Sequence, residues 1–207
     1  MKKVGVIDYG TGNLRSVVKA FEFIGAEVRL ITCPAEATAI EALVFPGQGT
    51  FDQCMGSLAK TGLDQLIKNW IYQEKPYFGI CLGLQVLFSS SEEGTKGGLG
   101  IHKGVVRRFA LDPKYKIPHM GWNSVYWEDG AGDDLMYGIE QGDQFYFVHS
   151  YHVCDVEKSD LHTFSCSYGY DFVSGIRFGK SIATQFHPEK SQEKGLTLYR
   201  NFLEKML

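Results

Sequence analysis

The chain has 207 residues, of which 44% are hydrophobic and 22% charged, a balance that is ordinary for a globular domain and too apolar for a disordered protein. The formal net charge of −3 excludes the basic footprint expected of a nucleic-acid-binding protein. No apolar run reaches the roughly 20 residues that a membrane-spanning helix needs, and the apolar stretch before Asp8 is too short for a signal peptide.

The five cysteines are odd in number and form no Cys-x-x-Cys pair. This distribution argues against a disulfide framework and a zinc ribbon, and it favours a reducing compartment. No composition shift or linker divides the chain. The sequence therefore predicts a cytoplasmic enzyme with a single domain over residues 1–207, without a metal site or a cofactor.

The first half of the chain alternates strand-like and helix-like segments. Short apolar runs predict strands at residues 4–8, 28–31, 42–45 and 77–80. Apolar residues at helical spacing predict helices over residues 14–24, 63–71 and 82–88. Turn residues separate these elements: Asn13 is predicted to cap the first helix, and Pro46-Gly47 to end the third strand. Strands separated by helices imply a parallel sheet with helices on both faces.

The second half contains strand-like runs with no long helical pattern between them. They lie at residues 105–109, 124–127, 145–148 and 163–168. Gly179-Lys180 separates two further runs, 176–178 and 182–186, which predicts a hairpin with a two-residue turn. The chain closes with an amphipathic helix, and the acidic stretch 128–134 is predicted to be an exposed loop.

Cys81 is the candidate nucleophile. It stands between Gly79 and Gly83, after a predicted strand and before a predicted helix, which is the nucleophile-elbow pattern with Cys in place of Ser. The glycines allow the tight turn, and the start of a helix favours the thiolate. The backbone N–H of Leu82 would then face a developing oxyanion. A buried structural cysteine is the alternative interpretation.

A candidate base follows the predicted strand at residues 182–186. Residues two apart on an extended chain share a face, so Glu189 can orient the imidazole of His187. Such a pair would complete a Cys-His-Glu triad. The alternative is a surface His-Pro-Glu turn without a role.

A glycine-rich loop follows the third predicted strand. Because ligands bind at the carboxyl ends of parallel strands, the Gly47-Gln48-Gly49 loop should lie at the same edge as Cys81. Its peptides are free enough to turn an N–H toward an oxyanion, and the N–H of Gln48 is the predicted second donor. A plain strand-to-helix turn is the alternative.

Residues 78–85 together with residues 187–189 resemble the class I, triad-type glutamine amidotransferases. The resemblance is more specific to the glutaminase subunits of imidazole glycerol phosphate synthases. Three further segments carry it, at residues 7–17, 118–123 and 146–151. The resemblance covers essentially the whole chain. It implies an α/β, flavodoxin-like fold, with a mixed, mostly parallel sheet and helices on both faces. It also implies an obligate partner, a (β/α)₈-barrel cyclase subunit.

The resemblance further implies a reaction of the histidine pathway. Cys81 attacks glutamine to form a thioester, and His187 protonates the leaving ammonia. Ammonia passes to the cyclase and yields imidazole glycerol phosphate and the carboxamide ribotide. Implied glutamine-binding residues are Gly49, Gln85, Glu93, Ser150 and Tyr151, and implied partner-interface residues are His119, Met120, Gly121, Trp122, Asn123 and Lys190.

Four other interpretations compete with this one. The chain could feed ammonia to a different synthase, as in sugar amidation, or could be a catalytically silent binding module. A dinucleotide-binding site is disfavoured, because the glycine-rich turn after the first strand lacks the third glycine of the dinucleotide-binding motif: position 15 is Arg. A metal site at His149 and His152 is disfavoured, because their odd offset on one strand would point the imidazoles to opposite faces.

Overall fold

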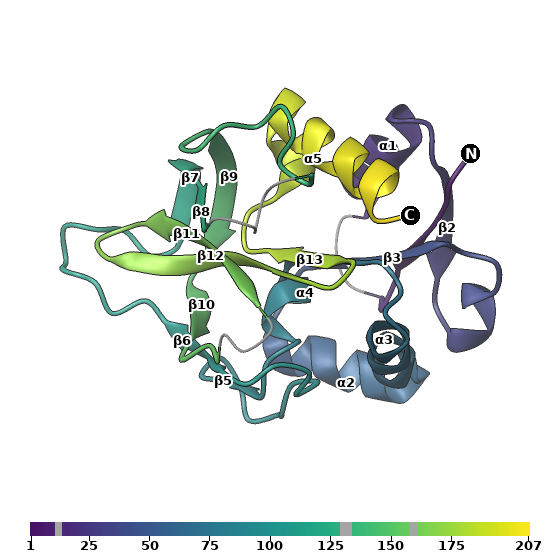
Figure 1. The fold of residues 1–207 in the computed structure, drawn as a ribbon. Helices are drawn as coiled ribbons and strands as arrows, with labels where there is room; N and C mark the ends of the chain where they lie inside the picture. Colours follow the sequence, from purple (N-terminus) through teal and green to yellow (C-terminus); the bar gives the residue numbers. More distant parts are fainter. Residues whose placement is uncertain (11–13, 129–133, 158–160) are drawn as a thin grey trace.

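The computed structural model describes residues 1–10, 14–128, 134–157 and 161–207 (Figure 1). The predicted helix cap at Asn13 and most of the predicted acidic loop at 128–134 lie outside the described residues. None of the described helices is long and apolar enough to cross a membrane.

The central strands of the main sheet run parallel. β1 (Lys3–Ile7) lies between β2 (Glu27–Ile31) and β3 (Ala42–Gly47), and the sheet continues from β3 to β4 (Tyr77–Cys81) and then β13 (Ser181–Thr184). β1, β3 and β4 are buried along nearly their whole length. Strands buried on both faces need helices on both sides, which is the predicted arrangement.

The second half of the chain extends the sheet with antiparallel strands, so the sheet is mixed. Among the described residues, eleven strands form this sheet, and two more form a small second one. The predicted hairpin is confirmed, because Phe178 pairs with Ser181 across Gly179 and Lys180. The remaining strands are β5 (Ser90–Ser91), β6 (Val105–Arg108), β8 (Tyr126–Trp127), β10 (Tyr151–Cys154), β11 (His162–Ser167) and β12 (Asp171–Phe178) in the main sheet, with β7 (His119–Ser124) and β9 (Gln144–His149) in the second.

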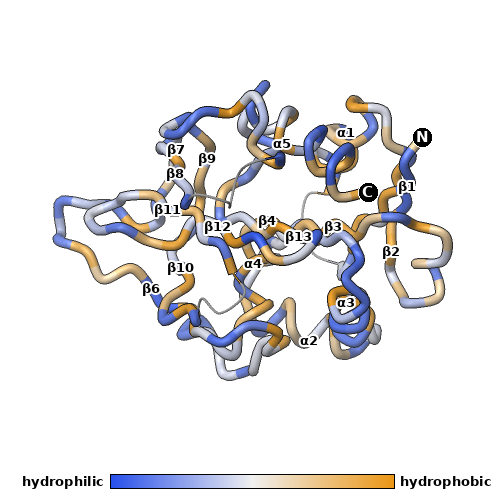
Figure 2. The backbone as a smooth tube through the Cα atoms, viewed as in Figure 1, coloured by the Kyte–Doolittle hydropathy of each residue, from blue (hydrophilic) through white to orange (hydrophobic). Residues whose placement is uncertain are grey.

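Helices cover both faces of the main sheet. α1 and α5 lie on one face and α2 and α3 on the other (Figure 1), and the buried apolar residues form two clusters accordingly. α3 and α5 carry hydrophilic and hydrophobic residues side by side (Figure 2), as amphipathic helices with one buried face should. The helices are α1 (Arg15–Phe23), α2 (Phe51–Thr61), α3 (Leu63–Tyr72), α4 (Leu82–Gln85) and α5 (Gln192–Lys205), with short 3₁₀ helices η1 (Pro34–Ala37) and η2 (Pro188–Lys190).

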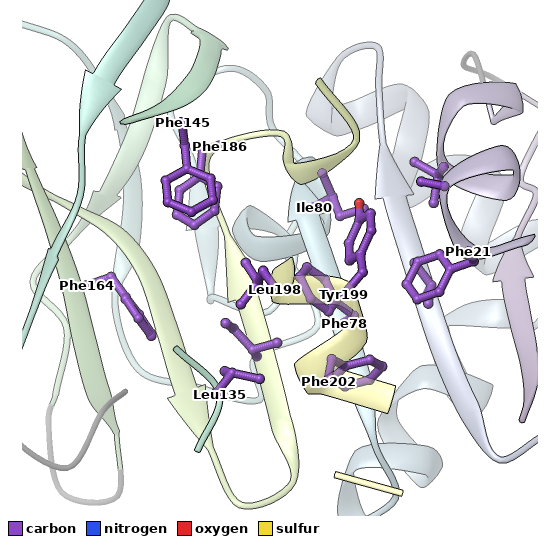
Figure 3. Packing of buried hydrophobic residues seen from close by; sticks show 14 of the residues in the cluster. Phe21, Phe78, Ile80, Leu135, Phe145, Phe164, Phe186, Leu198, Tyr199 and Phe202 are labelled. Carbon is purple, nitrogen blue, oxygen red and sulfur yellow. The ribbon is translucent and has the colours of Figure 1, made fainter. Parts of the chain in front are cut away.

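Aromatic packing fixes α5 and the segment before it against the sheet (Figure 3). Phe78 of β4 meets both Tyr199 and Phe202 of α5 edge-on, with ring centroids 5.1 Å apart in each pair. Phe145 of β9 packs on Phe186 at 4.4 Å. Because Phe186 directly precedes His187, this contact anchors the backbone that carries the candidate base.

β3 runs past the point where the sequence predicts its end. Pro46 and Gly47 are still paired with β4, and Gly47 lies opposite Cys81. Pairing with β1 stops at Val44. Proline lacks an N–H, so it is tolerated where one side of a strand has no partner. The glycine-rich loop therefore starts beside the candidate nucleophile.

Two further predictions need correction around β7 and β8. The segment around Trp122, where the sequence predicts no strand, is strand β7. The strand predicted at residues 124–127 shrinks to β8, because Val125 instead bonds to the backbone of Asp143 and Gly142.

The helices flanking the candidate nucleophile also differ from prediction. α2 was not predicted, although Phe51, Cys54, Met55 and Leu58 are buried at helical spacing. The predicted helix at 82–88 ends at Gln85, because the N–H groups of Leu87 and Phe88 bond to carbonyls three residues back, as in a 3₁₀ turn.

The expectation that His149 and His152 point to opposite faces is wrong. β9 ends at His149 and β10 begins at Tyr151, so the two histidines do not share one strand. Both rings instead pack against Phe109 and Phe172. The break in the strand between them removes the alternation on which the expectation depended.

Candidate active site

The backbone at Cys81 has the strained geometry of a nucleophile elbow. Cys81 ends β4 and is the N-cap residue of α4, with φ of 53° and ψ of −102°. A side-chain-bearing residue rarely adopts such a conformation, and the surrounding structure must hold it in place. The elbow places the thiol at the start of α4, in the wall of the cavity.

Both flanking glycines are required by close backbone contacts. A Cβ on Gly79 would lie 2.5 Å from the carbonyl oxygen of Gly83, and one on Gly83 would lie 2.3 Å from the carbonyl oxygen of Phe45. The Tyr77 hydroxyl also donates to the Gly83 carbonyl at 2.7 Å. The predicted role of these glycines in shaping the turn therefore has a steric basis.

His187 and Glu189 meet, but not because they share a strand face. β13 ends at Thr184, and His187 is the N-cap residue of η2. His187 Nδ1 lies 2.7 Å from Glu189 Oε1, and the two side chains are 4% and 3% exposed. A buried carboxylate at this distance fixes both the tautomer and the orientation of the imidazole.

The environment of His187 favours its charged form. Burial lowers the pKa of His187, but the neighbouring Cys81 sulfur and the Glu189 carboxylate outweigh it and raise the pKa to about 10. Nε2 of the ring is buried and has no hydrogen-bond partner among the described residues. An imidazolium beside a thiolate can protonate a leaving amine.

Gln185 also contacts the nucleophile, and sequence reasoning missed it. Its side-chain amide donates to Cys81 Sγ at 3.4 Å. Gln85 holds that amide in place by donating to Gln185 Oε1 at 3.1 Å, and it also donates to the Tyr151 carbonyl at 3.2 Å. Gln185 is fully buried. A polar residue within the apolar run at 182–186 was the available signal.

A cavity of about 400 Å³ opens at the sulfur of Cys81. That volume lies within the range typical of small-molecule sites. The Glu93 carboxylate in its wall accepts the N–H of Phe51 at 2.8 Å, at the start of α2. All five predicted glutamine-binding residues line the cavity with His187 and Leu82: Gly49, Gln85, Glu93, Ser150 and Tyr151.

The two predicted oxyanion donors are in different situations. Leu82 is the first residue of α4, so its N–H has no acceptor within the helix and lies at the cavity wall. The N–H of Gln48 instead donates to the Tyr9 hydroxyl at 2.7 Å. In this arrangement only the Leu82 donor is available to an oxyanion formed at Cys81.

The predicted interface residues on β7 range from buried to exposed. His119 is buried, with Nδ1 3.0 Å from His149 Nε2. Met120 and Trp122 on β7 are 61% and 43% exposed, so Trp122 is not a core residue. Gly121 and Asn123 are half-buried, and Asn123 donates to the Ser167 carbonyl at 2.9 Å.

An exposed strip connects β7 to the cavity. Trp122 meets the ring of Tyr146 edge-on at 6.1 Å, and Lys190 Nζ lies 5.7 Å from the centre of that same ring. Lys190 also lines the cavity. A protein bound over Trp122 would therefore reach the mouth of the site.

Comparison with known proteins assigns this arrangement to a family. The family model for glutamine amidotransferase class-I matches residues 5–206. The chain belongs to the class I glutamine amidotransferase family. It is therefore a glutamine amidotransferase, as the resemblance predicted.

Several relatives of this amidotransferase are named as imidazole glycerol phosphate synthases or as their HisH subunits. It is 46% identical over 200 residues to the imidazole glycerol phosphate synthase subunit HisH of Rhodopirellula baltica, covering 96% of both chains. Identity with HisH of Acinetobacter baylyi is 42% over 205 residues, covering 99% of this chain and 98% of that one. It is also 40% identical to the chloroplastic imidazole glycerol phosphate synthase hisHF of Arabidopsis thaliana, covering 99% of this chain and 34% of that protein.

Solved structures confirm the predicted fold class. The amidotransferase superimposes on PurLQS from Thermotoga maritima with a TM-score of 0.76 at 17% identity, covering 100% of this chain and 99% of that one. The crystal structure of a glutamine amidotransferase gives a TM-score of 0.75 at 19% identity, covering 97% of both chains. At these identities the likeness concerns the fold alone.

Proposed function

We propose that this amidotransferase is the glutaminase subunit of an imidazole glycerol phosphate synthase and acts in histidine biosynthesis in the cytoplasm. The HisH relatives, 42% and 46% identical over nearly the whole chain, support the pathway. The observation that carries the chemistry is the buried 2.7 Å His187–Glu189 pair in the cavity that contains Cys81. The whole chain, residues 1–207, acts as one glutaminase domain.

The first half-reaction forms a thioester. The Cys81 thiolate attacks the side-chain amide carbon of glutamine, and the negative charge moves to the amide oxygen. The N–H of Leu82 donates to that oxygen. The tetrahedral intermediate collapses, His187 gives its Nε2 proton to the leaving nitrogen, and ammonia departs.

The second half-reaction releases glutamate. His187 is now neutral and takes a proton from water as the water attacks the thioester carbon. The C–S bond breaks, the thiolate of Cys81 is restored, and His187 is again an imidazolium. The Glu189 carboxylate orients the ring and stabilises its charged form.

Glutamine is held by the walls of the same cavity. The Glu93 carboxylate gives the α-ammonium group of glutamine an opposite charge. Backbone groups of Ser150 and Tyr151 bind the amino-acid end, and Gly49 leaves room for it. Gln85 also lines the cavity, and its amide is already bonded to the Gln185 side chain and the Tyr151 carbonyl.

Ammonia is then passed to a (β/α)₈-barrel cyclase that forms a heterodimer with this chain. Exposed Met120 and Trp122 supply the apolar anchor of the interface, with Lys190 at the mouth of the cavity and His119, Gly121 and Asn123 supporting β7. In the cyclase, ammonia reacts with the phosphorylated ribulosyl intermediate and gives imidazole glycerol phosphate and the carboxamide ribotide. No nucleic acid, membrane or cofactor takes part.

Reconstitution tests this function. The purified chain is mixed with the cyclase and its phosphorylated substrate, and glutamate and imidazole glycerol phosphate are measured together. We expect glutamine-dependent product formation in a one-to-one ratio with glutamate. Glutamate release without product, or stimulation only by an unrelated synthase, would assign the glutaminase to a different partner.

A further inference from the structure

Three hydrogen bonds connect the segment that carries His187 to the neighbouring strand β9. The backbone N–H of His187 donates to the carbonyl oxygen of Tyr146 at 2.9 Å. The Ser191 hydroxyl accepts the backbone N–H of Tyr146 at 3.0 Å and donates to the carbonyl oxygen of His187 at 2.7 Å. Ser191 is 1% exposed, so these bonds are shielded from water. One buried hydroxyl therefore joins the backbone of the base to β9.

The turn after His187 explains why a side chain makes this connection. A neighbouring strand would offer both an N–H and a carbonyl to Tyr146. Here the chain enters η2 directly after His187, so the backbone supplies the N–H and the Ser191 hydroxyl supplies the acceptor. Without that hydroxyl the Tyr146 N–H would lose its bond, which is costly away from water.

The contact between Glu189 and His187 cannot by itself set where the imidazole lies relative to Cys81. Glu189 belongs to η2, the same short turn that begins at His187, so it orients the ring and moves with it. Contacts from outside the turn must fix its place. Phe145 of β9 provides one by packing on Phe186 (Figure 3), and Ser191, at the start of α5, provides another.

We infer that Ser191 is a positioning residue that sets the distance between His187 and Cys81. Its hydroxyl holds the η2 turn against β9, so that the imidazole meets the thiol in the cavity that both line. Ser191 itself is absent from the described residues that line this cavity. The inference rests on the proposed role of His187 as the proton donor, and it adds the residue that places this donor.

The kinetic test compares Ser191→Ala with wild type, each as the full chain in complex with the cyclase. The kcat for glutamate release should fall about 10- to 100-fold, because a misplacement of about 1 Å can cost about 10²-fold in rate. The KM for glutamine should stay within about twofold, because the variant leaves the cavity wall intact. Such a split separates placement of the base from binding of the substrate.

A second measurement follows the imidazole itself. The Cys81 sulfur is one of the groups that raise the pKa of His187 to about 10. If Ser191→Ala lets the ring move away from the sulfur, that pKa should fall. NMR titration of the His187 ring in the isolated full chain measures this without turnover and without a partner.

Ser181→Ala is the matched control. Ser181 is 4% exposed, and its hydroxyl also bridges two backbone groups: it accepts the Tyr77 N–H at 3.2 Å and donates to the Lys75 carbonyl oxygen at 3.5 Å. Tyr77 begins β4, whereas Cys81 ends it. Ser181→Ala should therefore lower the melting temperature about as much as Ser191→Ala does, and it should leave kcat and the pKa of His187 unchanged.

Ser191→Cys keeps the test valid even if Ser191→Ala does not fold. A thiol is a weaker donor and acceptor than a hydroxyl, so this variant weakens the two bonds without emptying the site. Its kcat should lie between those of wild type and Ser191→Ala, again with KM unchanged.

Two results would overturn the inference: wild-type kcat with an unchanged His187 pKa in the Ser191 variants, or an equal loss of kcat in Ser181→Ala. His187→Ala separates these results from failure of the proposed function, because glutamate release near the wild-type rate in that variant would contradict the proposed chemistry itself. If the cyclase does not stimulate wild type, the proposed partner is wrong. The NMR titration still tests the role of Ser191 in that case.

Discussion

The side-chain amide of Gln185 donates to the sulfur of Cys81 at 3.4 Å. A hydrogen bond to a thiolate stabilises the charged form, and Gln85 holds the donor in the orientation that this bond needs. The sulfur of Cys81 therefore contacts the amide of Gln185, which Gln85 holds in place. It also interacts with the His187–Glu189 pair.

Replacing Gln185 by Leu should weaken the nucleophile while keeping its volume close to the original. Without the donor, the Cys81 sulfur loses a hydrogen bond, so alkylation of Cys81 by iodoacetamide should become slower, and kcat should fall roughly tenfold. Gln65→Leu on the exposed side of α3 is the matched control. An unchanged alkylation profile in Gln185→Leu would show that the contact does not tune the thiol.

Glu189→Gln should reduce glutaminase activity less than His187→Ala. The histidine transfers protons, whereas the carboxylate orients the ring and stabilises its charge. Members of one triad act as a unit, so the double variant should be little slower than His187→Ala alone. Steady-state kcat of the three variants measures this, and additive losses would contradict a shared mechanism.

The free energy of unfolding should depend on pH because His187 titrates at a different pH in the folded and unfolded protein. Its pKa is raised from the ordinary 6.5 to about 10 in the folded protein. Because the folded pKa lies above the unfolded one, charged His187 stabilises the fold fully below about pH 6.5, and this contribution is lost as pH rises through 10. Denaturant unfolding from pH 6 to 11 should show the loss.

Cys81→Ala provides the control for this pH dependence. The Cys81 sulfur is one of the groups that raise the pKa of His187, so its removal should move the loss of stability to lower pH. The same transition in both proteins would mean that the Cys81 sulfur does not determine the charge of His187.

Trp122→Ala should weaken binding of the cyclase and leave the melting temperature nearly unchanged. Trp122 is 43% exposed, so its removal creates little cavity, whereas aromatic anchors often dominate interfaces. Calorimetric titration and thermal unfolding on the same preparation compare the two effects. A large loss of melting temperature with normal affinity would contradict the interface role.

Local sequence signals predicted the elements on which the chemistry depends. Gly79 and Gly83 indicated the elbow at Cys81, because a strand that turns directly into a helix needs backbone contacts too close for a Cβ. The Gly179-Lys180 turn was readable for a different reason, because glycine readily adopts the positive φ, here +49°, that a two-residue hairpin turn needs. His187 and Glu189 were paired correctly, although the chain joins them through a 3₁₀ turn rather than an extended strand.

Contacts between distant segments could not be predicted in this way. Gln185 reaches Cys81 across 104 positions, and Tyr9 reaches Gln48 across 39. No periodicity connects such residues, because the order of strands in the sheet brings them together. β7 was missed because Gly121 and its polar neighbours resemble a turn until β9 pairs with them.

The most direct test of the account is the Cys81→Ala variant in complex with the cyclase. Glutamine-dependent glutamate release and ammonium-dependent product formation are measured on the same sample. We predict that the first is abolished, since Cys81 is the proposed nucleophile, and that the second is retained, since the cyclase needs only free ammonia. Glutamate release by the variant at a rate near that of wild type would contradict the account.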